Sequence, residues 1–149
     1  MYAKELIATF NKINGRYNKL VFYLEACESG SMFVNLPNNT KIYALSAANP
    51  EESSWGTYCS PQDVVQGKHI GSCLGDLFSV NFLENNEEVN IFEETLDQQF
   101  AIIRDKTNQS HVLQWGDMSF KNDKVSEFLA PKKGVSFKFG IPSLSQLRK

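Results

Sequence analysis

An α/β fold with parallel strands is the fold class that the sequence predicts, from three observations. Residues 20–24 form a run of five apolar side chains that is rich in β-branched and aromatic types and too short for an independent helix. Such a run is typical of a strand covered on both faces of a parallel sheet. One-sided helical patterns lie before and after it. The 149 residues are 42% hydrophobic and include 11 Phe, which suits the core of one compact domain.

The first third of the chain predicts one helix and two strands. Apolar side chains recur at helical spacing over residues 2–13, which predicts an amphipathic helix that ends near Gly15. After the strand at 20–24, a crossover around residues 29–33 leads to a second short strand at residues 41–46. A right-handed parallel connection would place the end of this second strand near Cys27.

Helical spacing returns twice in the second half of the chain. The residues at helical spacing are expected to pack in the core, and they are Leu74, Leu77, Phe78 and Asn81, then Phe92, Leu96, Phe100 and Ile103. Residues 84–88 are uniformly polar, which predicts a solvated turn between the two helices. A last strand is expected at residues 111–115 and a last helix at residues 125–129.

Cys27 follows the end of the first predicted strand. Ligand sites in parallel sheets lie beyond the carboxyl ends of the strands, so this thiol is expected at the edge of an active site. Most free cysteines are merely small buried hydrophobes. The polar residues 28–31 favour the reactive interpretation, because their backbone N–H groups could hold an oxyanion beside a thiolate.

Composition excludes several classes of partner. The formal net charge is −2 and no long basic cluster is present, which argues against a nucleic-acid interface. No apolar run is long enough to span a bilayer, so we expect no membrane partner. The chain opens with a helical pattern and shows no signal peptide.

Residues 25–31, Glu-Ala-Cys-Glu-Ser-Gly-Ser, resemble the nucleophile region of the legumain family, the asparaginyl endopeptidases or vacuolar processing enzymes. The similarity covers about residues 1–129, and its further segments are 42–44, 47–59, 73–80, 94–96, 98–99 and 110–117. The Trp-Gly-Thr-Tyr-Cys and Cys-Leu-Gly-Asp segments are most similar to plant-type members. The resemblance implies a caspase-like three-layer α/β/α sandwich. Residues 1–149 would be its C-terminal part, without the N-terminal strands of the central sheet and without the prodomain of full-length relatives.

The resemblance also implies a reaction. Cys27 would be the nucleophile of a cysteine-type endopeptidase that cleaves after Asn, and less readily after Asp, through a thioacyl intermediate. An amine that intercepts this intermediate would give peptide ligase activity. The substrates would be peptides or proteins with Asn at P1, and no cofactor and no metal are expected. The P1 pocket of the family matches Glu25, Ser53, Ser54 and Asp76.

Carboxylates and hydroxyls suit this pocket, because they accept hydrogen bonds from an asparagine amide. Two close carboxylates raise the pKa of at least one of them, and the protonated pocket would then admit aspartate. The ordinary interpretation of the same residues stays open: Glu25 as an acid at a strand end, and Asp76 as a helix N-cap.

The catalytic histidine of the family lies upstream of the position that matches Met1. His69 lies in a polar, Gly-containing loop, and His111 matches a family histidine without a catalytic role, so we assign neither to catalysis. The alternative is therefore a truncated, inactive fragment or pseudoenzyme that acts as a peptide- or partner-binding module. An intact mass of the native polypeptide would separate the two hypotheses.

Cys59 and Cys73 bracket a loop that plant-type relatives close with a disulfide. Two reduced thiols, or half of a metal site, are the alternatives for this pair. Asn38 and Asn108 begin N-x-[ST] triplets, which are candidates for glycosylation. Together with the cysteine pair, these triplets favour the secretory route and, by resemblance, a vacuole or lysosome-like compartment.

Overall fold

A three-stranded sheet lies at the centre of the fold. The computed structural model describes residues 1–129, where the strands β1 (Leu20–Leu24), β2 (Ile42–Ser46) and β7 (Leu113–Gly116) pair in the order β1-β2-β7. β1 and β2 run parallel, whereas β7 runs antiparallel to β2. The predicted parallel pair is therefore confirmed, and an antiparallel strand extends it.

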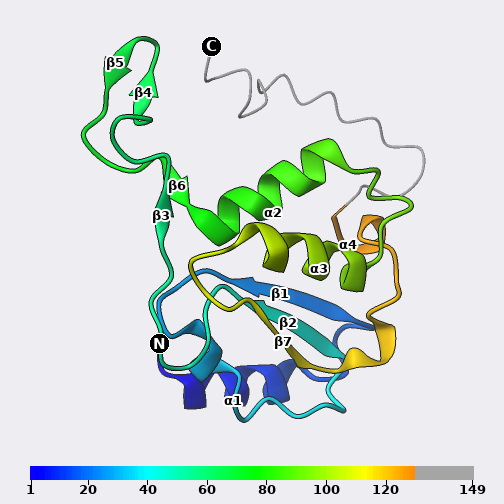
Figure 1. Ribbon diagram of the computed structural model, residues 1–149. Coiled ribbons are helices and arrows are strands. Elements are labelled where there is room, and N and C mark those ends of the chain that lie inside the picture. Colours follow the sequence, from blue (N-terminus) through cyan, green and yellow to red (C-terminus); the bar gives the residue numbers. More distant parts are fainter. Residues whose placement is uncertain (130–149) are drawn as a thin grey trace.

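Helices cover both faces of this sheet. Figure 1 shows α1 (Ala3–Ile13) on one face, and α2 (Leu77–Glu88) and α3 (Leu96–Lys106) on the other. The Leu6 and Phe10 side chains of α1 are buried against the sheet, as the apolar stripe predicts. The expected α/β/α layering is confirmed.

β2 is the fully buried strand. Ala44 packs in the core beneath α1 and Tyr43 in the core beneath α2 and α3, and both side chains are 0% exposed. β1 also contributes to both cores, with Phe22 on one face and Tyr23 on the other. Its residues stay half-buried, because β1 lies at the edge of the described sheet.

The polar residues 84–88 do not form a turn, and that prediction is wrong. They are the last residues of α2, which continues to Glu88. Asn85 is fully buried there and donates to both carboxylate oxygens of Glu94, at 3.0 and 2.9 Å. Residues in a polar run normally form hydrogen bonds with water, whereas Asn85 forms them with the buried Glu94.

Both predicted helical stripes begin earlier in the sequence than the helices of the structure. Leu74 and Phe92 are 37% and 59% exposed, and both precede their helices. α3 begins only after Thr95, because the Thr95 hydroxyl accepts from the N–H of Gln98 while the Gln98 side chain accepts from the N–H of Thr95. This capping box sets the start of the helix.

The last predicted strand starts two residues too early. The backbone N–H of His111 donates to the Glu52 carboxylate at 2.7 Å instead of joining the sheet, so β7 begins at Leu113. A one-turn helix, α4 (Ser126–Leu129), follows as expected. Two short 3₁₀ helices, η1 (Ser29–Met32) and η2 (Met118–Phe120), follow β1 and β7.

Residues 56–76 form an arm that extends away from the sheet and helices (Figure 1). We call these residues the disulfide arm. Two antiparallel pairs build it, β3 (Gly56–Thr57) with β6 (Gly75–Asp76) and β4 (Val64–Val65) with β5 (Lys68–His69). No helix within residues 1–129 has the length and apolar character needed to cross a membrane.

Candidate active site

The Cys27 thiol is exposed and lies against Ser54. Its Sγ atom is 3.7 Å from the backbone oxygen of Ser54 and 3.9 Å from the Ser54 hydroxyl. The structure therefore brings together two residues that are 27 positions apart in the sequence and that were both singled out from it. Ser53, the neighbouring pocket candidate, is exposed.

The loop after Cys27 is fastened to the segment that follows β2. The N–H of Gly30 donates to the carbonyl of Ala48 at 3.0 Å, and the Ser29 hydroxyl bonds to both backbone groups of Ala48. A Cβ atom on Gly30 would lie 2.9 Å from Pro50, so only glycine fits here without displacing that segment. This packing fixes the path of the loop, which we call the nucleophile loop (residues 27–31).

Glu25 caps helix α2 from a distance. Its Oε2 atom accepts from the backbone N–H of Ser79 at 3.0 Å and from the Ser79 hydroxyl at 3.1 Å. Asp76 occupies the N-cap position of α2, but its exposed side chain makes no capping hydrogen bond. The interpretation of Asp76 as the N-cap residue of α2 is therefore confirmed, although the side-chain hydrogen bonds to the first turn come from Glu25.

The second carboxylate oxygen of Glu25 is free. Oε1 is shielded from solvent and has no hydrogen-bond partner within the described part of the chain. Since buried acceptors are normally paired, an unpaired one is a natural place for an incoming donor. Glu25 bonds to the first turn of α2, which Asp76 precedes, and Ser54 lies at the thiol.

Both histidines are paired with carboxylates. The Nδ1 atom of His69 lies 2.8 Å from Asp63, and that of His111 lies 2.8 Å from Glu52. Within residues 1–129, the hydrogen-bond partners of the Cys27 thiol are two atoms of Ser54, and neither histidine is among them. Neither Asp63 nor Glu52 stands out in the sequence as a site residue.

Residues 1–132 match the sequence profile of the peptidase C13 family. The chain belongs to this family. It is 40% identical to mouse legumain over 131 residues, which are 88% of this chain and 28% of that protein. It is 40% identical to the vacuolar-processing enzyme of Ricinus communis over 138 residues (86% and 28%) and to the hemoglobinase of Schistosoma japonicum over 147 residues (97% and 33%).

This family of cysteine endopeptidases is the one that the nucleophile motif indicated, so the predicted resemblance is confirmed. The C13 chain spans less than a third of the length of the first relatives named, 28% in each case. Identity to the mouse and Ricinus proteins is equal at 40%, so it does not separate plant-type from animal members. The plant-type assignment stays a prediction.

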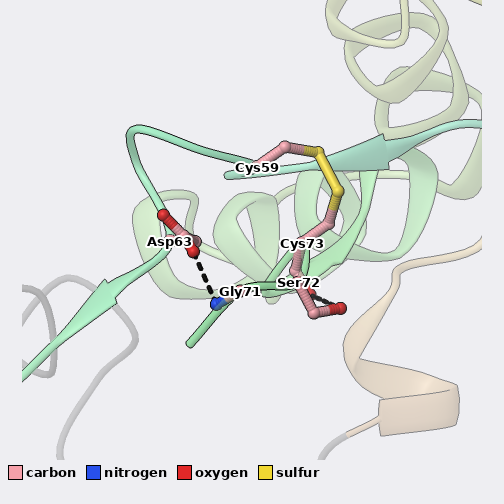
Figure 2. The surroundings of a disulfide bond; sticks show 5 residues. All are labelled: Cys59, Asp63, Gly71, Ser72 and Cys73. Carbon is pink, nitrogen blue, oxygen red and sulfur yellow. Dashed lines mark hydrogen bonds between the residues drawn. A yellow bond between two sulfur atoms is a disulfide. The ribbon is translucent and has the colours of Figure 1, made fainter. Parts of the chain in front are cut away.

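In this C13 chain, Cys59 and Cys73 form a disulfide that closes the arm. The two alternatives, reduced thiols and half of a metal site, are thereby contradicted. Among residues 1–129, no three His, Cys, Asp or Glu side chains are grouped to hold a metal ion. Figure 2 shows the disulfide beside Asp63, whose buried carboxylate accepts from the N–H of Gly71 at 2.7 Å.

Asp63 organises the tip of the arm. Hydrogen bonds from His69 and then from the N–H of Gly71 lower the pKa of this carboxyl group, so it stays ionised in mild acid. The Tyr58 hydroxyl donates to Glu84 of α2 at 2.8 Å and ties the base of the arm to the body. The glycosylation candidates Asn38 and Asn108 both lie on exposed backbone.

Proposed function

We propose that this chain is the part of a C13 endopeptidase domain that carries the nucleophile, Cys27, and that the enzyme cleaves peptide bonds after Asn and less readily after Asp. The contact between the exposed Cys27 thiol and Ser54 is the observation that carries this proposal. Peptide and protein chains would be the substrates.

The reaction begins when the thiolate of Cys27 attacks the carbonyl carbon of the scissile bond. A thioester forms, the C–N bond breaks, and the amine leaves with a proton. Water then attacks the thioester, frees the thiol and releases the product with a new carboxylic acid. An incoming amine would instead form a new peptide bond and release the ligated peptide. Backbone N–H groups of the nucleophile loop are candidates to stabilise the oxyanion.

The pocket for asparagine would use Glu25, Ser53, Ser54 and Asp76. The shielded, unpaired Oε1 of Glu25 supports this role, because it can accept a hydrogen bond from an amide N–H. An ionised aspartate side chain offers no such donor, so it fits only if it is protonated itself or if a protonated pocket carboxyl group donates to it. Cleavage after Asp would therefore be slower and would increase in acid.

A general base must take the proton of the thiol. The chain has two histidines, each paired with a carboxylate, and neither is a hydrogen-bond partner of the Cys27 thiol among the described residues. We infer that the base comes from a segment outside this sequence, within a longer polypeptide. The same observation favours the second candidate, a peptide-binding chain without catalytic activity.

Two experiments test the proposal. The intact mass of the native polypeptide shows whether a longer chain with a further histidine exists. In that polypeptide, Cys27→Ala should abolish turnover of a fluorogenic peptide with Asn at P1, while Cys27→Ser should retain the fold and lose turnover equally. Full activity of the Cys27→Ala protein would refute the assignment. Binding of the peptide without turnover by the native protein would favour the second candidate.

We also propose that the protein follows the secretory route to a vacuole or lysosome-like compartment. The disulfide supports an oxidising environment, and two curated relatives are named vacuolar-processing enzymes. Enzymatic removal of N-glycans from the native protein should lower its mass, and Asn38→Gln with Asn108→Gln should abolish that shift. A native protein without glycans and with reduced Cys59 and Cys73 would contradict this route.

A further inference from the structure

Glu52 joins three separate segments around the candidate site. Its carboxylate Oε1 accepts from the backbone N–H groups of Asn49 and His111, both at 2.7 Å. Its Oε2 lies 2.8 Å from Nδ1 of His111. Its backbone carbonyl accepts from the N–H of Glu28 at 2.7 Å. One residue thus holds its own turn, the nucleophile loop and the segment before β7.

The residues that follow Glu52 are Ser53 and Ser54. Ser54 contacts the Cys27 thiol, so the position of Glu52 determines where this serine meets the sulfur. Apolar burial contributes little at this point, because the side chains of Glu52 and His111 are 23% and 77% exposed. Hydrogen bonds therefore fix the position of the segment from Glu52 to Ser54.

The carboxylate is suited to this task because it is an acceptor only. Partial burial raises the pKa of Glu52, but hydrogen bonds from Asn49 and His111 outweigh that effect and lower the pKa overall. Glu52 therefore stays ionised, and an ionised carboxylate accepts hydrogen bonds more strongly than a neutral group. His111 is the titratable group that faces this carboxylate, and Glu51 is the adjacent carboxylate in the sequence.

We propose that Glu52 is a positioning residue for the reaction at Cys27, and that His111 fixes the conformation of Glu52. The pair holds the segment of Ser53 and Ser54 so that Ser54 contacts the thiol. This inference rests on the proposed role of Cys27 as the nucleophile. It gives His111 a function that is not general acid or base catalysis.

The test uses the native polypeptide and two thiol reagents. Cys27 is the one free cysteine of these 149 residues, and peptide mapping of the alkylated protein restricts the measurement to it. A peptide chloromethyl ketone with Asn at P1 reports on the assembled site, and iodoacetamide reports on exposure of the thiol. Glu52→Ala should slow labelling by the Asn reagent about tenfold, which corresponds to one lost hydrogen bond to a charged group. Iodoacetamide labelling should change less than about twofold.

Three further variants make the comparison specific. Glu52→Gln keeps an acceptor for the two backbone N–H groups and should fall between the wild type and Glu52→Ala. His111→Ala removes only the ring and should show a smaller loss in the same direction. Glu51→Ala is the matched control, an exposed acid at the adjacent position whose loss should change neither rate. Equal losses in Glu51→Ala and Glu52→Ala, or no loss in Glu52→Ala, would overturn the inference.

Hydrogen exchange separates this inference from the proposed function. The N–H of Glu28 should exchange faster in Glu52→Ala than in Glu51→Ala, whatever the substrate of the enzyme. If the wild type reacts equally with reagents that carry Asn or Ala at P1, the proposed specificity is wrong, and the exchange data still test Glu52. Unchanged exchange in Glu52→Ala would refute the positioning role alone.

Discussion

Glu25 and Ser79 are joined by two hydrogen bonds that link the end of β1 to the first turn of α2 across 54 residues of sequence. One oxygen of the Glu25 carboxylate accepts both bonds, and the other has no hydrogen-bond partner within residues 1–129. A negative charge at a helix N-terminus is stabilising, because it faces free N–H groups and the positive end of the helix dipole. Glu25 is therefore a structural cap with one oxygen left for a ligand.

This double role predicts that Glu25→Ala lowers the free energy of unfolding by about 1 kcal/mol, the typical cost of losing a helix cap. Urea denaturation of the native protein measures it. Glu87→Ala is the control, since Glu87 is an exposed carboxylate near the other end of α2, where its loss should be neutral. Equal effects of the two substitutions would show that Glu25 is not the cap.

The buried pair of Asn85 and Glu94 predicts a dependence of stability on pH. Burial raises the pKa of Glu94, and the hydrogen bond from Asn85 lowers it by a smaller amount. The Asn85 carbonyl oxygen is itself buried and unpaired among the described residues, so a protonated Glu94 would have an acceptor for its proton. Tyr23 is an ionisable group that interacts with Glu94, and it stays neutral because burial raises its pKa.

The sign follows from proton binding. Because the pKa of folded Glu94 is raised, the folded protein binds more protons than the unfolded chain between the ordinary carboxyl pKa and the folded value. The stability that Glu94 contributes is fully present below the ordinary pKa and is lost as pH rises through the folded value. Mild acid therefore stabilises the contact between α2 and the segment before α3.

Glu94→Gln should remove this dependence, because the Gln amide donates to Asn85 at every pH. Above the folded pKa the variant should be more stable than the wild type by about 1 to 3 kcal/mol, the cost of a buried acceptor left unpaired. Thermal unfolding between pH 4 and 8, at about half-unit steps, gives the two curves. Glu93→Gln changes an exposed neighbour and should leave the pH dependence of stability as in the wild type. If Glu94→Gln also leaves that dependence unchanged, the role of Glu94 is refuted.

The sequence predicted those parts of the fold that depend on local pattern. The bounds of β1 were correct because five apolar residues in a row have few alternatives to a strand. The position of Cys27 followed from the strand and from the resemblance of residues 25–31. Contacts between distant polar residues were not predictable in this way. Asn85 and Glu94 are buried against each other, but in the sequence each is a polar residue that is expected to face solvent. Glu25 and Glu52 bind partners that are 54 and 59 residues away in the sequence.

The disulfide predicts local rather than global stabilisation. Cys59 and Cys73 are 14 positions apart in the sequence, and closing a loop of this length stabilises it by about 3 kcal/mol in the chain-entropy model. Because the arm extends away from the body (Figure 1), most of this effect should appear as local opening. Changing both cysteines to Ser should speed proteolysis within residues 59–73 by at least tenfold and shift the global unfolding midpoint little. Cys27→Ser should leave the cleavage rate unchanged; a large global shift in the double variant would contradict this account.

Gly116, at the end of β7, predicts the most severe single substitution. Its φ of +80° is a conformation that L side chains rarely adopt, and a Cβ atom there would overlap the carbonyl oxygen of Ile42. That carbonyl accepts a hydrogen bond from the N–H of Asp117 at 2.7 Å, so it cannot move without breaking the end of the sheet.

Gly15 is the matched comparison, because it has a similar φ of +85° and a Cβ atom there would meet no atom within 4 Å. Gly15→Ala should therefore cost only the conformational strain, about 1 kcal/mol. Gly116→Ala should cost about 3 kcal/mol more, because a backbone clash adds to the same strain. Chemical denaturation of the two variants isolates the clash, since the backbone term is common to both. Equal destabilisation would mean that Gly116 is required only for its backbone conformation, and that β7 does not pack against Ile42 as closely as the structure shows.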